Sequence, residues 1–370
     1  MPTTTHVARA LVALGFLAFA GCGGGGGGGT PAAAPARFVY TANAGDGAVA
    51  AFRFDGETGG LTQLPGSPFA AGLVPYGIAR HPSGRFLYVA NEDDGTVSGF
   101  AVDQATGALS PLTGSPYGPI TRPSALVADP DGGAIYVLSS QATAQVRPMA
   151  VAADGSLSPL GPPVDAGQGA FAAAMHPAGV ALYVANGGDE TISGFAILRS
   201  GALSPLPGSP FPSAGVPSAL AFDPSGRFLY VANRNGAVIR VFDVDPLTGV
   251  MAENAALATV FSAPAALAMD PGGRFLYAMS AVLGDTTVHA FQIDGGTGAL
   301  AAVPGAPFAG GVAGMFGMLV EPAGRFLVAP GYSAGTVAVL AIDQATGALT
   351  PVAGSPFTAG SGPRRAVVTP

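Results

Sequence analysis

The sequence RFLYVAN, at residues 85–91, recurs unchanged at residues 227–233. Weaker copies of it begin at Arg37, Gly133, Val180, Arg274 and Arg325. In six copies the tyrosines follow one another at 47 or 48 residues, and Val328 takes the tyrosine position in the last copy. These tyrosines are Tyr40, Tyr88, Tyr136, Tyr183, Tyr230 and Tyr277. A unit of this length repeated seven times is typical of the blades of a β-propeller.

Each unit predicts four short strands joined by tight turns. The strand that carries the tyrosine is apolar nearly throughout, which indicates a strand buried on both faces. Turns such as Pro130-Asp131-Gly132 precede it, with proline setting φ. A five-residue Asp-to-Gly turn closes the next hairpin, and its glycine is free to adopt a positive φ. This turn stands at residues 55–59, 103–107, 245–249, 294–298 and 343–347.

The two ends of the repeat complement each other. The first unit starts at Arg37 with its tyrosine strand, so it lacks an innermost strand. The chain ends with residues 365–370, which have the pattern of an innermost strand with no blade behind it. Pairing the two ends removes the exposed sheet edges of a linear array. We therefore predict an all-β, seven-bladed propeller of four-stranded blades, closed by its C-terminal strand on the N-terminal blade.

Composition supports a folded β protein and excludes some functions. Gly 57 and Pro 34 are abundant, but the apolar fraction of 49% and the regular placement of both residues argue against disorder. All fifteen basic residues are arginine, so chemistry that needs a lysine, such as a Schiff base, is excluded. The net charge of −7, with no basic run, argues against nucleic acid as a partner.

The N-terminus has the pattern of an export signal. Residues 10–21 are an apolar stretch that is too short to span a bilayer. They end in Phe19-Ala20-Gly21-Cys22, which resembles a bacterial lipobox and predicts lipid attachment at Cys22. We predict a lipoprotein signal peptide at residues 1–21, a lipidated Cys22 with a Gly/Pro/Ala tether to residue 36, and the propeller at residues 37–370. The expected location is the cell envelope, or outside the cell if Cys22 is not lipidated.

The repeat motifs resemble a known family. YVAN at residues 88–91 and 230–233, PSGR at residues 82–85 and 224–227, and GALSPL at residues 107–112 and 201–206 are similar to the seven-bladed lactonase family. That family includes 6-phosphogluconolactonase-like and carboxymuconate cyclase-like proteins, and the related YVTN-repeat propellers share the first motif. The resemblance implies a propeller fold, and for lactone-processing members it implies His, Arg and Glu around the channel mouth.

Candidate binding residues come from two sets of loops that share one face of a propeller. One set leads into the innermost strands and the other follows the tyrosine strands. We select Tyr76, Glu92, Asp93, Arg122, Gln168, Arg234, Arg364 and Arg365. The converging arginines are able to hold a carboxylate or phosphate with two hydrogen bonds. The alternative is that these are solvated loop charges.

The histidines and one serine motif have structural explanations. The mouth positions that follow the loop prolines hold no histidine, and His81 and His176 instead precede turn prolines, where a turn role explains them. His289 lies in the middle of a strand. The match to G-x-S-x-G at residues 331–335 is rejected as a nucleophile elbow, because it joins two strands and no histidine follows it.

No cofactor is expected from the sequence. The acidic pairs Asp93-Asp94 and Asp243-Val244-Asp245 offer oxygen ligands for Ca²⁺, but neither has the spacing of a known calcium loop. No disulfide or cysteine-based zinc site is possible within one chain, since Cys22 is the single cysteine.

Two functional hypotheses follow. The first is a noncatalytic envelope lipoprotein that binds a small anionic ligand, a glycan or an envelope protein on its channel face, and touches the membrane only through its lipid. The second is a lactonase or cycloisomerase acting on a sugar-acid lactone, with arginine polarising the carbonyl and a carboxylate positioning water. We prefer the first hypothesis because of the predicted lipid anchor, the tether and the absence, at the mouth, of the histidine that the resemblance implies.

Overall fold

The computed structural model describes residues 36–259, 263–280, 282, 284–314 and 317–369. The chain divides into Met1–Pro35 and a compact unit, Ala36–Pro370. The predicted signal peptide, Cys22 and most of the tether lie outside the described residues. Within the described residues there are only strands and turns, and no helix that is long and apolar enough to cross a membrane.

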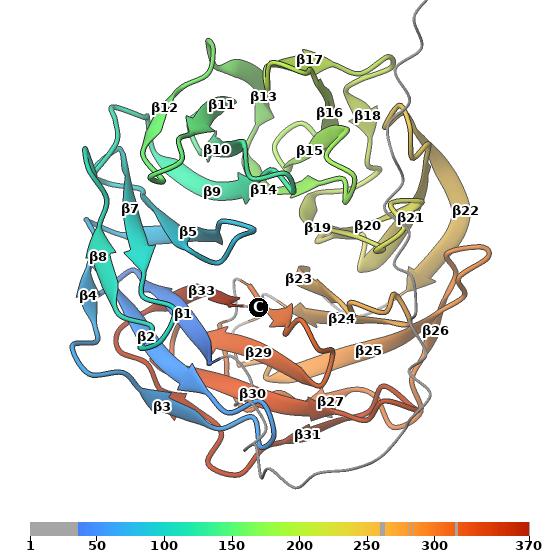
Figure 1. Cartoon of the computed structure of the whole chain (residues 1–370). Coiled ribbons are helices and arrows are strands. Elements are labelled where there is room, and N and C mark those ends of the chain that lie inside the picture. The colour runs from blue at the N-terminus through green and yellow to red at the C-terminus, as the bar shows by residue number, and fades with distance from the viewer. Residues whose placement is uncertain (1–35, 260–262, 281, 283, 315–316, 370) are drawn as a thin grey trace, which may run out of the picture. The chain divides into compact units, whose positions relative to one another are not determined.

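The compact unit is a ring of seven antiparallel sheets, as predicted (Figure 1). In sequence order around the ring, the innermost strands are β5 (Pro75–Arg80), β9 (Pro123–Ala128), β14 (Ala170–Met175), β19 (Pro217–Phe222), β23 (Pro264–Met269), β28 (Leu319–Val320) and β33 (Pro363–Val368). The tyrosine strands come second, and they are β1 (Arg37–Asn43), β6 (Phe86–Asn91), β10 (Ala134–Ser139), β15 (Ala181–Asn186), β20 (Phe228–Asn233), β24 (Phe275–Ser280) and β29 (Phe326–Gly331).

The outer half of each sheet follows the same order. The third strands are β2 (Ala48–Phe54), β7 (Thr96–Val102), β11 (Thr143–Val151), β16 (Thr191–Ile197), β21 (Val238–Val244), β25 (Thr287–Ile293) and β30 (Thr336–Ile342). The outermost strands are β3 (Leu61–Gln63), β8 (Leu109–Pro111), β12 (Leu157–Pro159), β17 (Leu203–Pro205), β22 (Met251–Thr259), β26 (Leu300–Ala302) and β31 (Leu349–Pro351). Short strands that also pair with a third strand are β4 (Phe69–Ala70), β13 (Val164–Gln168), β18 (Phe211–Pro212), β27 (Phe308–Ala309) and β32 (Phe357–Thr358).

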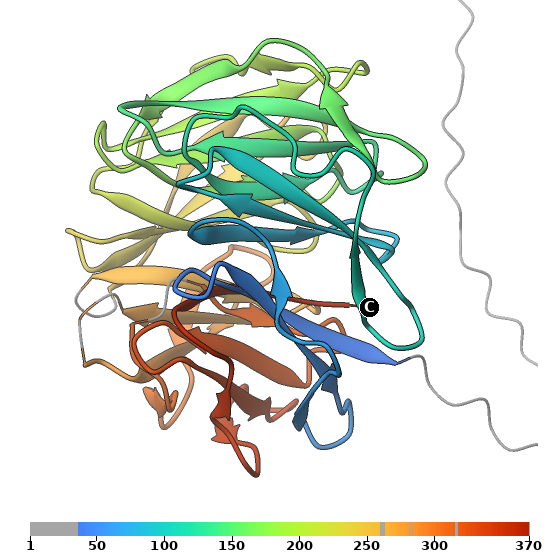
Figure 2. The same cartoon turned by 90° about the vertical axis from the view of Figure 1, so that its left-hand side faces the viewer.

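We number the blades 1 to 7 from the sheet that contains β1. Blade 1 takes its innermost strand from the other end of the chain, because β33 pairs with β1 along Val39↔Val368 to Asn43↔Pro363. Seen from the edge of the ring, β33 ends close to the start of β1 (Figure 2). There the amide of Thr369 donates to the Phe38 carbonyl, and its Oγ1 accepts from the Phe38 amide at 2.8 Å. The predicted closure is confirmed.

The repeated tyrosines join neighbouring blades. Each tyrosine ring is buried. Its hydroxyl donates to the carbonyl of a glycine in the next blade, and this glycine ends the hairpin turn between the third and the outermost strand. The pairs are Tyr40–Gly107, Tyr88–Gly155, Tyr136–Gly201, Tyr183–Gly249, Tyr230–Gly298 and Tyr277–Gly347. A Cβ atom on Gly107 would lie 2.4 Å from the ring of Phe38, and its φ is 76°. Tyrosine and glycine therefore recur together because they form one contact between blades.

The apolar tyrosine strands are buried on both faces, as predicted. All six residues of β6 are buried, and the core around Tyr88 includes Ile135 and Val137 of the next blade. The hydrophobic core is thus a series of layers between adjacent sheets, and burial of this apolar surface is the main force that holds the ring together.

The two faces of the ring carry different loops. One face, which we call the turn face, carries two kinds of turn in each blade: the turn between the first and second strands and the hairpin turn between the third and outermost strands. The other carries the loops before the innermost strands and those between second and third strands, and we call it the mouth face. Pro75 pairs with Asn91 at the mouth end of blade 2, which confirms that both loop sets share one face.

His81 and His176 lie on the turn face, and the predicted turn role is confirmed, because Nδ1 of each accepts from a backbone amide of its own turn, Ser83 for His81 and Ala178 for His176. His81 Nε2 is 2.8 Å from the carbonyl of Gly132, and His176 Nε2 is 3.0 Å from that of Gly226, in each case in the following blade. His176 is buried, and burial lowers its pKa below 6.5 although the Gly226 contact opposes this.

The lowered pKa of His176 predicts how stability depends on pH. As the pH decreases below about 6.5, His176 binds a proton more readily in the unfolded chain than in the folded chain. The free energy of unfolding therefore falls as the pH decreases. Chemical denaturation between about pH 5.5 and 7.5 measures this slope. We expect His176→Gln, which retains a donor for Gly226, to have a smaller slope than the wild type. An equal slope would contradict this.

Candidate functional site

A β-bulge near the mouth end distinguishes the innermost strands. In six of them the pairing with the second strand skips one residue just after the start. The skipped residues are Tyr76, Ser124, Phe171, Ser218, Ala265 and Arg364. A bulge turns a side chain out of the regular alternation, and bulges are frequent beside active sites. Tyr76 and Arg364 owe their place at the mouth to it.

Backbone strain also gathers on the mouth face. Among the described residues, the six non-glycine residues with positive φ all lie in its loops: Val74, Arg122, Glu190, Ala214, Ala237 and Ala263. Residues other than glycine rarely adopt a positive φ, and residues held in this strained backbone conformation tend to cluster at functional sites. The strain makes the mouth face the first candidate for function.

Arg364 contacts two aromatic rings, one from each of the neighbouring blades. Its guanidinium carbon is 4.2 Å from the ring centre of Tyr76 in blade 2 and 5.0 Å from that of Tyr332 in blade 7. A guanidinium is attracted to aromatic faces at such distances. The two predicted residues Tyr76 and Arg364 are thus brought together, and Tyr332 joins them.

Arg365 lies directly beside this group. At its position, the first after the bulge, five other innermost strands carry Gly77, Ala125, Ala172, Ala219 and Ala266. Gly317 of blade 7 makes the room, since a Cβ atom on it would be 3.2 Å from Cγ of Arg365. Burial lowers the pKa of Arg365, the Arg364 charge lowers it further, and Tyr76 raises it. The two arginines thus form one positively charged group.

A carboxylate is held at the mouth between blades 2 and 3. Oε1 of Glu92 accepts from Arg122 at 2.6 Å and from the Ser140 hydroxyl at 3.1 Å. The Glu92 side chain is 11% exposed and that of Arg122 is 59% exposed. The hydrogen bond to Glu92 raises the pKa of Arg122. The structure therefore brings Glu92 and Arg122 together, as a second cluster on the same face.

Of the other predicted site residues, Asp93 lies at the edge of the second cluster, whereas Gln168 and Arg234 lie in other blades. Asp93 is exposed beside Glu92, and its charge also raises the pKa of Arg122. Gln168 is exposed between blades 3 and 4, where its backbone N–H donates to the Asp189 carboxylate at 2.7 Å. Arg234 is half-buried in blade 5, and its amide donates to the Val216 carbonyl.

The acidic pairs weighed for Ca²⁺ have structural contacts instead. Asp94 accepts from the Leu73 amide at 2.6 Å, and Asp46 and Asp189 make the same kind of contact in blades 1 and 4. Asp243 accepts from Asn254, and Asp245 caps its own hairpin. No group of three or more His, Cys, Asp or Glu side chains that suits a metal occurs in the described ranges.

Tyr332 and Ser140 were missed by the sequence analysis. Both occupy the position just after the second strand, where Glu92 and Arg234 were selected. A comparison of the residue that directly follows the second strand in each of the seven repeat units identifies both Tyr332 and Ser140. Tyr332 was assigned instead to the G-x-S-x-G match, which indeed joins β29 to β30 in a turn closed by Gly335 and Gly331, so the rejection of a nucleophile elbow is confirmed.

Comparison with known proteins agrees with the fold. The family described as "Lactonase, 7-bladed beta-propeller" matches residues 32–121 and 199–313. A Bacteroides uniformis protein named as a candidate 6-phosphogluconolactonase superposes with a TM-score of 0.78 at 19% identity, over 90% of this chain and 100% of that one. The Pseudomonas aeruginosa periplasmic gluconolactonase PpgL gives 0.77 at 20% identity, over 90% and 99%. No curated protein matches the chain in sequence.

The fold and the mouth face define a seven-bladed propeller with a charged and aromatic channel mouth. The family match covers more than half of the chain, so the protein belongs to the seven-bladed β-propeller lactonase family. The resemblance found in its repeat motifs is thereby confirmed.

Proposed function

We propose that this protein hydrolyses a sugar-acid lactone at its mouth face. The observation that carries the proposal is the presence, on one strained face, of an arginine held by aromatic rings and a carboxylate held by hydrogen bonds. Family membership and the fold shared with proteins named as gluconolactonases favour this hypothesis over the noncatalytic binding module that the sequence analysis preferred.

The chemistry assigns one step to each cluster. Arg364 donates to the lactone carbonyl oxygen and stabilises the negative charge that develops there. Glu92 accepts a proton from a water molecule, whose oxygen attacks the carbonyl carbon. The bond to the ring oxygen then breaks, and that oxygen takes up the proton to give a hydroxy acid. Arg122 and Ser140 orient Glu92, since both donate to its Oε1.

Export and lipid attachment at Cys22 belong to the same proposal. They would place the mouth face outside the cytoplasm, where it meets lactones of the envelope or the surroundings. A noncatalytic site for a small anionic ligand, a glycan or an envelope protein is the second candidate. It differs from the first by binding without turnover.

Lactone turnover tests the proposal directly. With the full chain and a panel of aldonic-acid lactones, we expect ring opening above the spontaneous rate, followed by acid release. Glu92→Gln removes the proposed base and should lower kcat by about 10²–10⁴-fold. Glu190→Gln, an exposed glutamate in a strained loop of the same face, is the matched control and should retain activity. Absence of turnover on every lactone would overturn the proposal in favour of binding alone.

A further inference from the structure

The chain contains two Asn-Gly pairs, and the structure places them in different surroundings. Asn186-Gly187 lies at the end of β15, and Asn235-Gly236 lies in the mouth-face turn that joins β20 to β21 (Figure 1). An asparagine followed by glycine can react with its own backbone, because glycine has no Cβ to hinder the approach of its amide nitrogen to the asparagine side chain. Whether the reaction occurs depends on how firmly both groups are held.

Asn186-Gly187 is held at both reacting groups. The Asn186 side chain is buried, and its Nδ2 donates to the hydroxyls of Thr191 and Ser193 at 3.2 and 2.9 Å. The amide of Gly187 donates to the Gly169 carbonyl at 2.9 Å. These three hydrogen bonds must open before the groups can react, so this pair is protected.

The reacting groups of Asn235-Gly236 are held by neither device. Both residues are exposed. Among the described residues, neither the Asn235 side chain nor the backbone amide of Gly236 has a hydrogen-bond partner. The amide nitrogen and the side-chain carbon that it would attack are therefore both accessible in the folded protein.

The turn of Asn235 also lacks a contact that holds the equivalent turns of other blades. In blades 1, 2 and 4, the third residue after the buried asparagine of the second strand is an aspartate. Its carboxylate accepts from a backbone amide in the segment before the innermost strand, at 2.6 Å for Asp46 and Asp94 and 2.7 Å for Asp189. In blade 5 this position is Gly236, which has no side chain to make the contact. The blade 5 turn is thus held less firmly.

We propose that Asn235, and not Asn186, is a site of spontaneous modification in the folded protein. The amide nitrogen of Gly236 loses its proton to hydroxide and attacks Cγ of Asn235. The Cγ–Nδ2 bond breaks, Nδ2 takes up a proton and leaves as ammonia, and a cyclic succinimide remains. Water then opens the ring at either carbonyl, which gives aspartate or isoaspartate at position 235. Each product exchanges the NH₂ group for OH, so water is the only co-reactant.

The modification changes the charge of the mouth face. It adds a carboxylate next to Arg234 in the chain, at the position that Asp93 occupies in the equivalent turn of blade 2. A new negative charge on this face disfavours the approach of an anion. The inference goes beyond the proposed function, since it concerns another residue and a reaction in which no lactone takes part.

Peptide mapping of the full chain after incubation at mildly alkaline pH tests this site. Trypsin cleaves after Arg234 and Arg240, so Asn235 is released in the peptide 235–240. Mass spectrometry, with chromatographic separation of aspartate from isoaspartate, measures both products, and a sample digested without incubation gives the background. We expect both products at position 235, and conversion of Asn186 at least about 10-fold more slowly, because its hydrogen bonds must open first.

Two controls separate the effect of the fold from that of the dipeptide. In the urea-unfolded chain both pairs lose their surroundings, so we expect similar rates at the two positions. Gly236→Ala places a methyl group beside the attacking nitrogen and should slow conversion of Asn235 several-fold. The turn accommodates this change, because the added Cβ would lie 3.2 Å from Cγ2 of Val238 and Gly236 has no positive φ.

Two results would overturn the inference. One is the absence of conversion at Asn235 in the folded protein. The other is equal conversion of Asn186 and Asn235 in the folded protein, since burial and hydrogen bonding would then offer no protection. Both results are independent of whether lactones are hydrolysed.

Discussion

Replacing Arg364 by glutamine is expected to lower kcat/KM for lactone hydrolysis by about 10²–10³-fold, the usual effect of losing one donor to a developing oxyanion. Glutamine can still donate one hydrogen bond but carries no charge and makes no cation–π contact with Tyr76 or Tyr332. Initial rates of acid release at constant pH measure the effect.

The control for this prediction is Arg85→Gln. Both arginines lie over aromatic rings, at 4.2 Å for Arg364 over Tyr76 and 5.4 Å for Arg85 over Phe86, but only the first lies on the mouth face. Circular dichroism and thermal unfolding establish that both variants are folded. If Arg364→Gln retained activity within about 3-fold of the wild type, Arg364 would not be the group that stabilises the transition state.

The sequence was sufficient to predict the fold because its period is strong. The unchanged copies of RFLYVAN define the second strand of two blades, and the mismatch between Arg37 and residue 370 predicts closure without any structural input. The same register places Tyr76, Glu92, Arg122 and Arg364 on one face, which the structure shows.

The composition of the site was harder to predict, for a physical reason. Arg364 and Tyr76 lie at opposite ends of the chain and meet only because the ring closes between them. Whether a loop side chain points to the mouth depends on the bulge and on positive φ, and neither leaves a clear mark in a single sequence. Gln168 was selected from the same set of loops as Tyr76, and Arg234 from the same set as Glu92, but both lie in other sectors of the ring.

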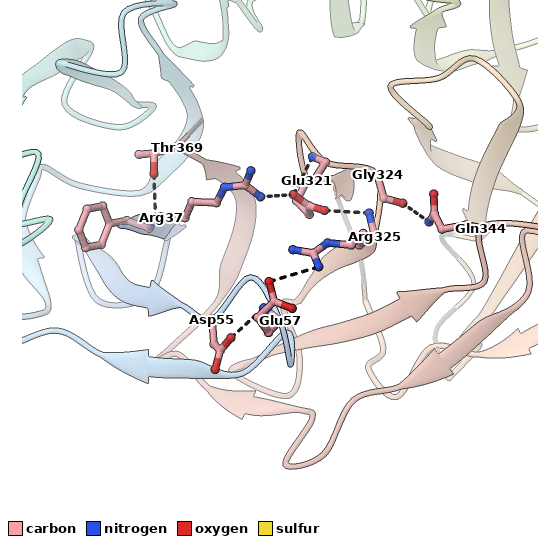
Figure 3. Close-up of polar contacts among 10 residues, drawn as sticks. Arg37, Asp55, Glu57, Glu321, Gly324, Arg325, Gln344 and Thr369 are labelled. Atoms are coloured by element: carbon pink, nitrogen blue, oxygen red, sulfur yellow. Dashed lines mark hydrogen bonds and ion pairs between the residues drawn. The ribbon is translucent and has the colours of Figure 1, made fainter. Parts of the chain in front are cut away.

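The contacts where the ring closes give the second large prediction, on stability. Glu321 stands where other blades carry Asp223 or Asp270, and its longer side chain reaches from blade 7 to blade 1 (Figure 3). Its buried carboxylate accepts from Arg37 and from the amides of Ala323 and Arg325, each at 2.8 Å.

Glu321→Ala is therefore expected to lower the free energy of unfolding by about 3 kcal/mol, since it leaves a partly buried guanidinium and two backbone donors without their acceptor. This lies at the low end for breaking a buried ion pair, because the Arg37 side chain is 26% exposed. Glu57→Ala is the control: Glu57 also contacts an arginine across this junction, Arg325 at 3.6 Å, but it is 85% exposed, so its loss should cost less than about 1 kcal/mol. Urea unfolding of both variants measures the difference. Similar values for the two would show that the buried Glu321 carboxylate contributes no more to the stability of this junction than an exposed ion pair does.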